Sequence, residues 1–371
     1  MPPVSLLVKP ASSLCNLRCG YCFYADVSDS RKEKSRGIMP DEVLELLVRR
    51  AFQEASGSCS FSFQGGEPTL AGLDFFRRLT ALQKQYNTKK LPVRNALQTN
   101  GLLLDNEWAD FLAENSFLVG LSLDGGRELH DSMRKDADGG GTYARVMQAA
   151  GLLDRHGVEY NVLCVVHNAA ARHPQQVYRA LKRFRYLQFI PCLDPLDGSK
   201  PPHSLDPKRY GEFLKGTFDC YYADFFSKSP VSVRSFDNYA AMLAGCPPES
   251  CGMSGVCACC LTVEADGSVY PCDFYALDEY LLGNVRDNSL AEMARSEAAQ
   301  RFIQPSLSVH EDCRSCGWYP ICRGGCRRNR PACADGRPGK NELCDAYRAF
   351  FAYAYPRLLR CAAAFRTQGL R

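Results

Sequence analysis

Short apolar runs alternate with segments of helical periodicity along the first half of the chain. The runs are rich in β-branched and aromatic residues and are bounded by polar or glycine-bearing stretches, which is typical of strands. They predict strands at Ser5–Val8, Ser60–Gln64, Val93–Thr99, Phe117–Leu123, Val158–Val166 and Tyr186–Ile190. Apolar residues at helical spacing predict helices between them, at Asp41–Ala55, Leu73–Tyr86, Asn106–Asn115, Tyr143–His156 and Pro174–Phe184.

This alternation predicts an α/β fold. Strand, helix and strand in succession give a parallel sheet with right-handed crossovers, and six such units predict a partial (β/α)6 TIM-like barrel over residues 1–195. In such barrels the chemistry gathers at the carboxyl ends of the strands. Polar segments follow the first four strands, so we expect one opening to be lined by Cys15–Cys22, Gln64–Pro68, Gln98–Gly101 and Ser122–Gly125.

The pattern changes after residue 195. A stretch rich in Gly, Pro and Ser leads to a predicted helix at Pro207–Phe226, and we expect residues 196–245 to bridge two domains. Within residues 246–371, twelve of the twenty cysteines lie between Cys246 and Cys344. Their clearest regular element is a hairpin, Leu261–Glu264 and Ser268–Tyr270, turned by Asp266-Gly267. We therefore expect a mostly irregular domain that metals organise, with a helix at its C-terminal end.

Composition narrows the choice of partners. A net charge of +4 over 371 residues falls short of the basic footprint of a nucleic-acid binder, and no apolar run is long enough to cross a membrane. The first residues are too short an apolar stretch for a signal peptide, which favours the cytoplasm. The thiols cluster at metal-ligand spacings and the six histidines do not accompany them, which favours iron–sulfur or all-cysteine zinc sites over disulfides.

Three cysteines, Cys15, Cys19 and Cys22, follow the first predicted strand. A four-iron cluster takes four thiolates, so three from a tight loop leave one iron free to bind another molecule. Catalytic zinc sites keep an open position for the same reason. A zinc knuckle completed by a distant cysteine is the alternative.

The spacing C-x3-C-x2-C, with Tyr21 before the last cysteine, resembles that of the radical S-adenosylmethionine (SAM) enzymes. The resemblance implies a [4Fe–4S] cluster on these three thiols, whose open iron chelates SAM and whose electron cleaves it to a 5′-deoxyadenosyl radical. Gly65-Gly66-Glu67-Pro68 resembles the motif that binds the methionyl ammonium in that family. The resemblance also implies that Ser122 holds the ribose, that Arg134 pairs with the methionyl carboxylate, and that Tyr21 and Leu193 lie against the adenine.

The C-terminal cysteines have spacings similar to those of the SPASM domain, an auxiliary-cluster module. The resemblance implies two further [4Fe–4S] clusters, one on Cys251, Cys257, Cys272 and Cys326, the other on Cys313, Cys316, Cys322 and Cys344. Spacing alone does not decide this division, and Cys259 or Cys260 could replace Cys257. An arginine run near the last ligands, at Arg323, Arg327, Arg328 and Arg330, favours charge balance of a cluster over nucleic-acid recognition, because no aromatic platform accompanies it.

Across nearly its whole length the chain resembles the anaerobic sulfatase-maturating enzymes. The resemblance rests on the runs Lys9–Ser13, Gln64–Leu70, Cys192–Pro195, Cys251–Met253 and Asp266–Tyr275. It implies oxidation of a cysteine or serine in a sulfatase polypeptide to Cα-formylglycine, with Asp273 as the general base and an auxiliary cluster as the electron acceptor. An electron donor such as flavodoxin or ferredoxin would serve the first cluster. Two alternatives stay open, namely a radical SAM maturase of a ribosomally made peptide and a zinc-stabilised interaction protein.

Overall fold

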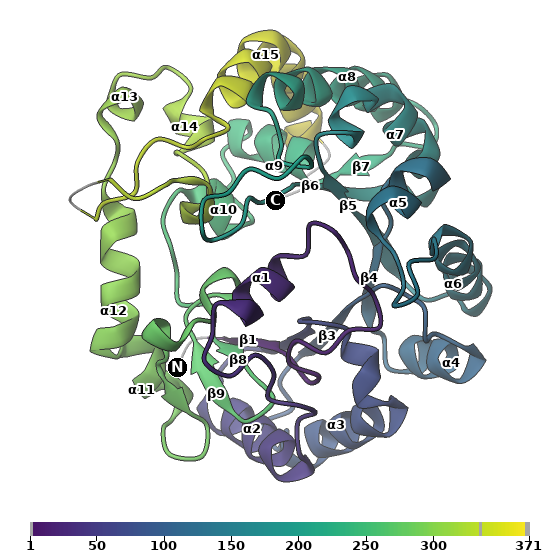
Figure 1. The fold of residues 1–371 in the computed structure, drawn as a ribbon, viewed down its shortest axis with the longest axis vertical. Coiled ribbons are helices and arrows are strands. Elements are labelled where there is room, and N and C mark those ends of the chain that lie inside the picture. The colour runs from purple at the N-terminus through teal and green to yellow at the C-terminus, as the bar shows by residue number, and fades with distance from the viewer. Residues whose placement is uncertain (1–2, 334–335, 368–371) are drawn as a thin grey trace. The chain divides into compact units, whose positions relative to one another are not determined.

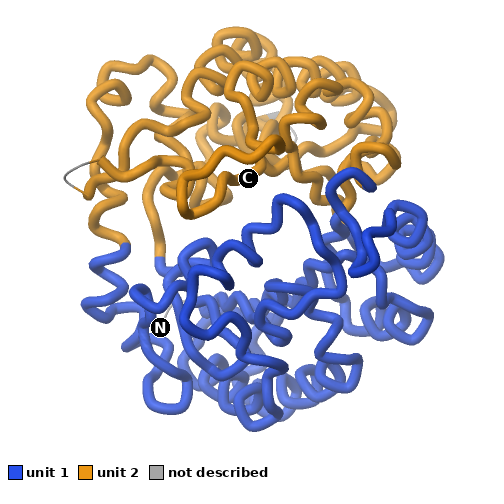
Figure 2. Tube along the Cα trace, viewed as in Figure 1, with its two compact units in different colours: residues 1–122, 131–160, 259–302 blue, residues 123–130, 161–258, 303–371 orange. Residues whose placement is uncertain are grey.

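The computed structural model describes residues 3–333 and 336–367. Its contacts divide the chain into two compact units, each built from several segments (Figure 2). Unit 1 comprises residues 1–122, 131–160 and 259–302, and unit 2 comprises residues 123–130, 161–258 and 303–371. Segments of the two units alternate along the chain, whereas the domains expected from the sequence follow one another. The division into consecutive domains stays a prediction.

Unit 1 contains the first four predicted strands, each within two residues of its expected bounds. They are β1 (Val4–Val8), β2 (Cys59–Phe63), β3 (Val93–Thr99) and β4 (Leu118–Ser122). Each is parallel to the next. Because neighbouring parallel strands end at the same edge, the turns that follow β1, β2 and β3 come together, as the alternating pattern predicts.

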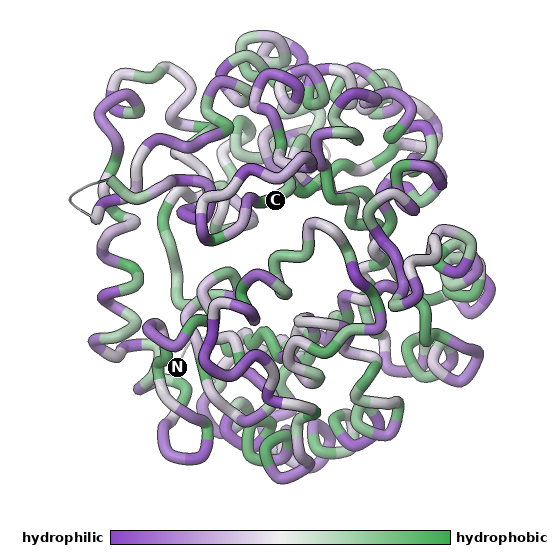
Figure 3. The backbone as a smooth tube through the Cα atoms, viewed as in Figure 1, coloured by the Kyte–Doolittle hydropathy of each residue, from purple (hydrophilic) through white to green (hydrophobic). Residues whose placement is uncertain are grey.

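Amphipathic helices cover these strands. Figure 1 shows α2 (Asp41–Glu54) and α3 (Leu73–Tyr86) side by side along the strands of unit 1, and Figure 3 shows hydrophobic and hydrophilic stretches alternating along both. The buried face of α3 contributes Phe76, whose ring centroid lies 5.1 Å from that of Phe63 on β2. The other helices of this unit are α1 (Phe23–Asp29), α4 (Asn106–Glu114), α6 (Tyr143–His156), α11 (Leu290–Arg295) and the short η1 (Pro68–Ala71), η4 (Asp273–Tyr275) and η5 (Asp278–Tyr280).

The predicted hairpin of the cysteine-rich region is confirmed, and it joins the sheet of unit 1. Strands β8 (Thr262–Val263) and β9 (Ser268–Tyr270) are antiparallel, and Gly267 turns between them with φ +87°. Strand β8 pairs in parallel with β1, and β10 (Gly283–Asn284) pairs with β9. The local pattern does not predict the pairing of β8 with β1, because these two strands are far apart in sequence.

Unit 2 holds the last two predicted strands, β5 (Tyr160–Val166, apart from its first residue) and β6 (Tyr186–Pro191), with a short third strand, β7 (Ser232–Val233). All three are parallel neighbours. Beside them, α8 (Pro207–Phe225), α9 (Arg234–Leu243) and α15 (Cys344–Thr367) pack through a shared aromatic core. The shorter helices include α7 (Pro174–Leu181), α10 (Cys251–Ser254), α13 (Glu311–Arg314), α14 (Tyr319–Cys322), η2 (Ala170–Arg172), η3 (Lys182–Phe184), η6 (Gln304–Leu307) and η7 (Arg327–Asn329).

Two helices cross the boundary between the units, α5 (Arg127–Met133) and α12 (Glu297–Ile303). The α/β class predicted from the sequence is confirmed by these elements and their parallel pairing. In the described ranges, no helix combines the length and the apolar character that a membrane crossing requires.

Candidate active site and metal centres

The loop with the first three cysteines follows β1 and is fixed by main-chain hydrogen bonds. The amide of Arg18 donates to the carbonyl of Lys135 at 2.7 Å, and the amide of Gly20 donates to the carbonyl of Met133 at 3.0 Å. All three thiols are half-buried. The loop therefore has a defined path, set by a segment more than a hundred residues away that the cysteine spacing does not reveal.

The glycine pair after β2 packs against this cysteine loop. Gly65 has φ +115°, and the amide of the next residue, Gly66, donates a hydrogen bond to the carbonyl of Ser12 at 2.9 Å. A Cβ on Gly66 would lie 2.0 Å from the carbonyl oxygen of Leu14. In the structure these glycines let two backbone segments touch; their contact with a cofactor stays a prediction.

Glu67 is buried and ties two strand-end turns together. Its carboxylate accepts hydrogen bonds from the amide and hydroxyl of Thr69, the hydroxyl of Thr99 and the amide of Asn100, at 2.7–3.1 Å. Burial raises the pKa of Glu67, and these donors oppose that shift. Three of these bonds end on Oε1 and one on Oε2, so the side chain is held within the protein, and we place the expected contact with a cofactor on the main chain of Glu67.

Three other expected SAM contacts lie in unit 1. Arg134 lies between Met133 and Lys135, whose carbonyls accept hydrogen bonds from the cysteine loop. Its guanidinium is 5.5 Å from the centroid of the Tyr21 ring. Ser122, at the end of β4, accepts a hydrogen bond from Gln98 at 3.0 Å. Leu193 belongs to unit 2, and its contact with adenine stays a prediction.

Asp273 is held by the side chains of Tyr24, on α1, and of Lys9, the first residue after β1. The hydroxyl of Tyr24 donates to Oδ2 of Asp273 at 2.6 Å, and Nζ of Lys9 lies 3.0 Å from Oδ1. Gln64 contacts the same Tyr24 hydroxyl at 3.1 Å. Burial, and then the carboxylate of Asp273, raise the pKa of Tyr24 well above its ordinary value, so the phenol stays a donor. The side chain of Asp273 is 12% exposed.

Four C-terminal cysteines line one cavity in unit 2. Cys313, Cys316, Cys322 and Cys344 surround a space of about 460 Å³, together with Lys340, Arg348 and Trp318. These four are the set that the SPASM resemblance assigns to one cluster. The cavity supports that assignment, which the spacing alone left undecided.

Three cysteines of the other set are neighbours in unit 2. The thiols of Cys251 and Cys257 are close enough to Cys326 to disfavour its thiolate form. Burial raises the pKa of Cys257, and the charges of Arg327 and Arg330 oppose that rise, which supports the charge-balance interpretation of the arginine run. Cys272 belongs to unit 1, so its place in this set stays a prediction.

The donor sets fit iron–sulfur clusters. Burial raises the pKa to about 11 at Cys15, Cys322 and Cys326. These thiols would therefore lose their protons and act as ligands only where a metal supplies positive charge. Thiolates without histidine are typical ligands of such clusters. Among the described residues, no three His, Cys, Asp or Glu side chains converge on a single-ion position, whereas a four-iron cluster is held by separate thiolates.

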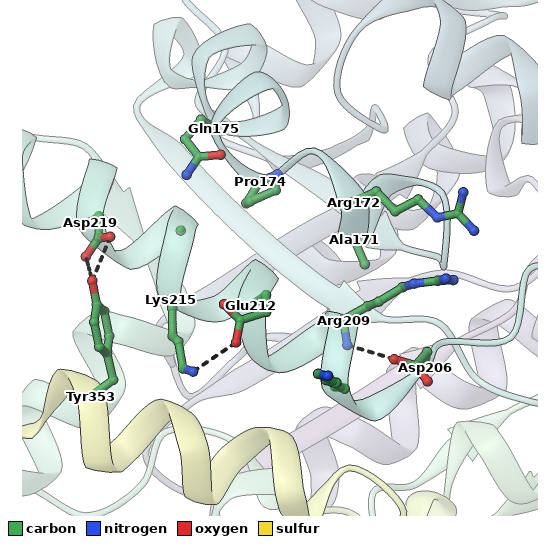
Figure 4. Close-up of a pocket in the computed structure, with 12 residues that line it drawn as sticks. Ala171, Arg172, Pro174, Gln175, Asp206, Arg209, Glu212, Lys215, Asp219 and Tyr353 are labelled. Atoms are coloured by element: carbon green, nitrogen blue, oxygen red, sulfur yellow. Dashed lines mark hydrogen bonds and ion pairs between the residues drawn. The ribbon is translucent and has the colours of Figure 1, made fainter.

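A further open cavity in unit 2, of about 950 Å³, contains no cysteine (Figure 4). Its charged side chains largely satisfy one another: Lys215 pairs with Glu212, Asp219 accepts from Tyr353, and Asp206 caps α8. We assign no site there.

Comparison with known proteins identifies the family. Residues 10–181 match the Radical SAM superfamily, and residues 255–317 match the SPASM iron-sulfur cluster-binding domain. A cysteine-type anaerobic sulfatase-maturating enzyme of Clostridium perfringens is 51% identical over 98% of this chain and 99% of its own length. The chain belongs to the anaerobic sulfatase-maturating enzymes. The family predicted from the sequence is thereby confirmed, with its SAM and [4Fe–4S] cofactors.

Two other comparisons concern the difference between the cysteine and serine types of this family. A serine-type member from Bacteroides thetaiotaomicron is 33% identical over 95% of this chain and 90% of its own. The solved structure of native anSMEcpe with bound AdoMet and Kp18Cys peptide is 50% identical, covers 98% of this chain and 100% of that chain, and superposes with a TM-score of 0.94. The greater likeness is to the cysteine type.

The sequence analysis missed part of the candidate site around Asp273. It did not single out Lys9 or Tyr24, which contact Asp273. Lys9 reads as an interruption of an apolar stretch, and Tyr24 as an aromatic residue after the last loop cysteine. One signal in the sequence could have identified Lys9. It is the first residue after β1, and functional side chains of such folds lie at the carboxyl ends of the parallel strands.

Proposed function

We propose that this protein oxidises a cysteine residue in a sulfatase polypeptide to Cα-formylglycine. The observation that carries the proposal is 51% identity, across both the radical SAM and the SPASM regions, to a cysteine-type maturating enzyme. The arrangement around Asp273 supports it, because the reaction requires a base at the substrate thiol.

The residues that would hold the cofactors fall into the groups described above. Cys15, Cys19 and Cys22 would hold the cluster that binds SAM, with Tyr21, the Gly65–Glu67 main chain, Ser122, Arg134 and Leu193 around the nucleotide. The two C-terminal sets, Cys251, Cys257, Cys272 and Cys326, then Cys313, Cys316, Cys322 and Cys344, would each close a cluster. When bound, these groups supply a 5′-deoxyadenosyl radical that takes one hydrogen atom from the substrate Cβ, and an acceptor for one electron.

Asp273 completes the balance of the oxidation. Converting a CH₂–SH group to a thioaldehyde removes one hydrogen atom, one proton and one electron; water then replaces sulfur and releases hydrogen sulfide. In our proposal Asp273 takes the thiol proton. Tyr24 and Lys9 occupy its two oxygens from the protein side, so the carboxylate keeps one orientation as the substrate arrives.

The protein needs an external electron source for each radical that it generates. We propose a small redox protein such as flavodoxin or ferredoxin as that donor, and the cytoplasm, where such donors are reduced, as the place of action. We propose no nucleic-acid or membrane partner, because the arginine run is engaged within the fold: Arg328 donates to the carbonyl of Asp194, and Arg330 to that of Gly255.

The test is a peptide assay under anaerobic conditions. Reconstituted protein, SAM and a chemical reductant are incubated with a peptide that contains a Cys-x-Pro-x-Arg run, and the aldehyde is trapped with a hydrazine and identified by mass. We expect aldehyde and 5′-deoxyadenosine in equal amounts. The matched peptide with Ser in place of Cys measures whether the serine substrate is also accepted. Cofactor cleavage without aldehyde from either peptide would refute the proposal and favour a ribosomal-peptide maturase.

A further inference from the structure

Lys9 lies between two carboxylates in unit 1. Its ammonium is 3.0 Å from Oδ1 of Asp273 and 3.5 Å from Oε1 of Glu264. On the far side, Nη1 of Arg31 lies 2.6 Å from the same oxygen of Glu264. The four side chains thus form one line of alternating charge, Arg31, Glu264, Lys9 and Asp273, which ends at the proposed base.

This line is buried and electrically balanced. Lys9 and Arg31 are 2% and 6% exposed, and Glu264 is fully buried. Burial alone would lower the pKa of Lys9, but Asp273 and Glu264 more than offset it and raise the pKa above its usual value. Glu264 behaves conversely: burial would raise its pKa, and Lys9 and Arg31 lower it below the usual value. Lys9 and Glu264 are therefore ions at neutral pH.

The strand register places Lys9 at this position. Val8 of β1 pairs with Val263 of β8, and the amide of Lys9 donates to the carbonyl of Val263 at 2.8 Å. Lys9 and Glu264 are thus the first residues beyond two paired parallel strands. Their side chains meet because the C-terminal hairpin joins the sheet of the N-terminal region.

We propose that Lys9 is a positioning residue for the oxidation, acting through Asp273. Glu264 and Arg31 hold the ammonium of Lys9 in place, and Lys9 holds Oδ1, so that Oδ2 stays with Tyr24 and the carboxylate is aimed at the substrate. Without Lys9 only the Tyr24 hydroxyl restrains the carboxylate, and cofactor cleavage leads to much less product. The proposal rests on the proposed function, in which Asp273 is the base.

The test compares the yield of aldehyde per 5′-deoxyadenosine in the reconstituted full-length enzyme with the cysteine peptide. In Lys9→Met we expect this ratio to fall by about 10²-fold, the cost of a small misplacement of a catalytic group, while 5′-deoxyadenosine formation stays within a few-fold of the wild type. Lys9→Arg keeps the cation and should restore part of the ratio. Lys34→Met, which removes an exposed lysine paired with Asp29, is the matched control and should leave the ratio unchanged.

Further measurements on the same variant separate positioning from folding. In Lys9→Met the Asp273 carboxylate loses its cation, which is destabilising, whereas Glu264 keeps Arg31 at 2.6 Å. We therefore expect a lower melting temperature, with peptide affinity and iron content close to those of the wild type and the product ratio still reduced. Loss of peptide affinity or of iron in step with the product ratio would assign Lys9 to structure alone and overturn the proposal.

The outcomes also distinguish this proposal from the proposed function. If the wild type makes no aldehyde, the function fails and the role of Lys9 in it fails with it. If the wild type makes aldehyde and Lys9→Met keeps the wild-type ratio, the function stands and the positioning role of Lys9 is wrong.

Discussion

The cysteine loop of unit 1 and the cysteine cavity of unit 2 offer the same kind of metal ligand in different numbers. The loop offers three thiols on a path fixed by hydrogen bonds to neighbouring backbone, whereas the cavity is lined by four thiols. Three thiolates leave a four-iron cluster one open iron, and four close it. One ligand more or less therefore separates a centre that binds and activates a cofactor from one that only carries an electron.

The two regions also differ in what holds the thiols in place. Strand-end turns hold the loop, and Gly66 packs on it without room for a Cβ. The cavity is built from short helices, and Arg323, Gly324 and Gly325 adopt φ of 51°, 82° and 74° in succession. The main-chain hydrogen bonds along this path join residues three or four apart, such as Gly325 to Cys322 at 3.2 Å, whereas those that fix the loop join distant segments. We infer that unit 1 prepares its site by folding, and that the cavity of unit 2 depends more on its metal.

The largest effect that this comparison predicts is loss of the open centre. Cys19→Ala should abolish both SAM cleavage and peptide oxidation, because two thiolates do not hold the cluster that binds SAM. The measurement is 5′-deoxyadenosine and aldehyde by chromatography after anaerobic reconstitution. Retained SAM cleavage in this variant would contradict the assignment of the loop.

Loss of a closed centre should separate the two activities. In Cys322→Ala we expect SAM cleavage to persist and aldehyde to disappear, because the lost ligand belongs to the cavity set and the radical is generated elsewhere. Iron and sulfide analysis should give about one cluster fewer than the wild type. If both activities vanish while the iron content of the loop cluster is intact, the two regions are not functionally separate.

Asp273→Asn tests the base and should have the next largest effect. The amide keeps the shape of the side chain and cannot take a proton, so peptide oxidation should fall by about 10²–10⁴-fold. SAM cleavage should continue, since Asp273 is not among the expected cofactor contacts. The measurement is the initial rate of each product with saturating peptide; an unchanged rate of aldehyde formation would remove Asp273 from its role.

The sequence predicts the strands and the loop well, and the contacts across the fold poorly, for a physical reason. Strands β1 to β6 are short apolar runs set between amphipathic helices. The spacing of apolar residues that distinguishes a strand from a helix is a local property of the chain. The pairing of β8 with β1 joins Leu7 to Thr262, and nothing local in either run specifies it. Lys9 and Glu264 meet only through that pairing, so their ion pair could not be foreseen.

Glu67 and the glycines show the same limit at the candidate site. The motif around them is recognisable from sequence, and the resemblance assigns it to the cofactor. The structure adds that the carboxylate of Glu67 is fully engaged with Thr69, Thr99 and Asn100. A motif can thus be read correctly as part of a site while the task of its individual side chains depends on neighbours from other strands.

Gly66→Ala should weaken the folded site of unit 1 by a smaller amount. A Cβ at this position would lie 2.0 Å from the Leu14 carbonyl oxygen, and relief of such an overlap costs about 1–3 kcal/mol. Thermal unfolding followed by circular dichroism measures the loss. Gly126→Ala is the matched control, because a Cβ there meets nothing within 4 Å and the change should stay within about 0.5 kcal/mol. Equal effects of the two substitutions would contradict the tight packing of the loop.

Arg330→Met should have the smallest effect and should act on a closed centre alone. Arg330 is 8% exposed. Burial raises the pKa of Cys257 and Cys326, and the charge of Arg330 opposes that rise. A positive charge that favours thiolates also favours the reduced state of the cluster they would hold, so its removal should make the reduction potential of that cluster more negative. We expect a shift of no more than about 60 mV, the equivalent of about 1.4 kcal/mol for one electron. Redox titration followed by electron paramagnetic resonance measures it, with Arg301→Met, an exposed arginine on α12, as the control. The cluster on the loop should keep its potential in both variants. A shift confined to the loop cluster would reverse the assignment of Arg330, because it would place the charge beside the open centre instead of the closed one.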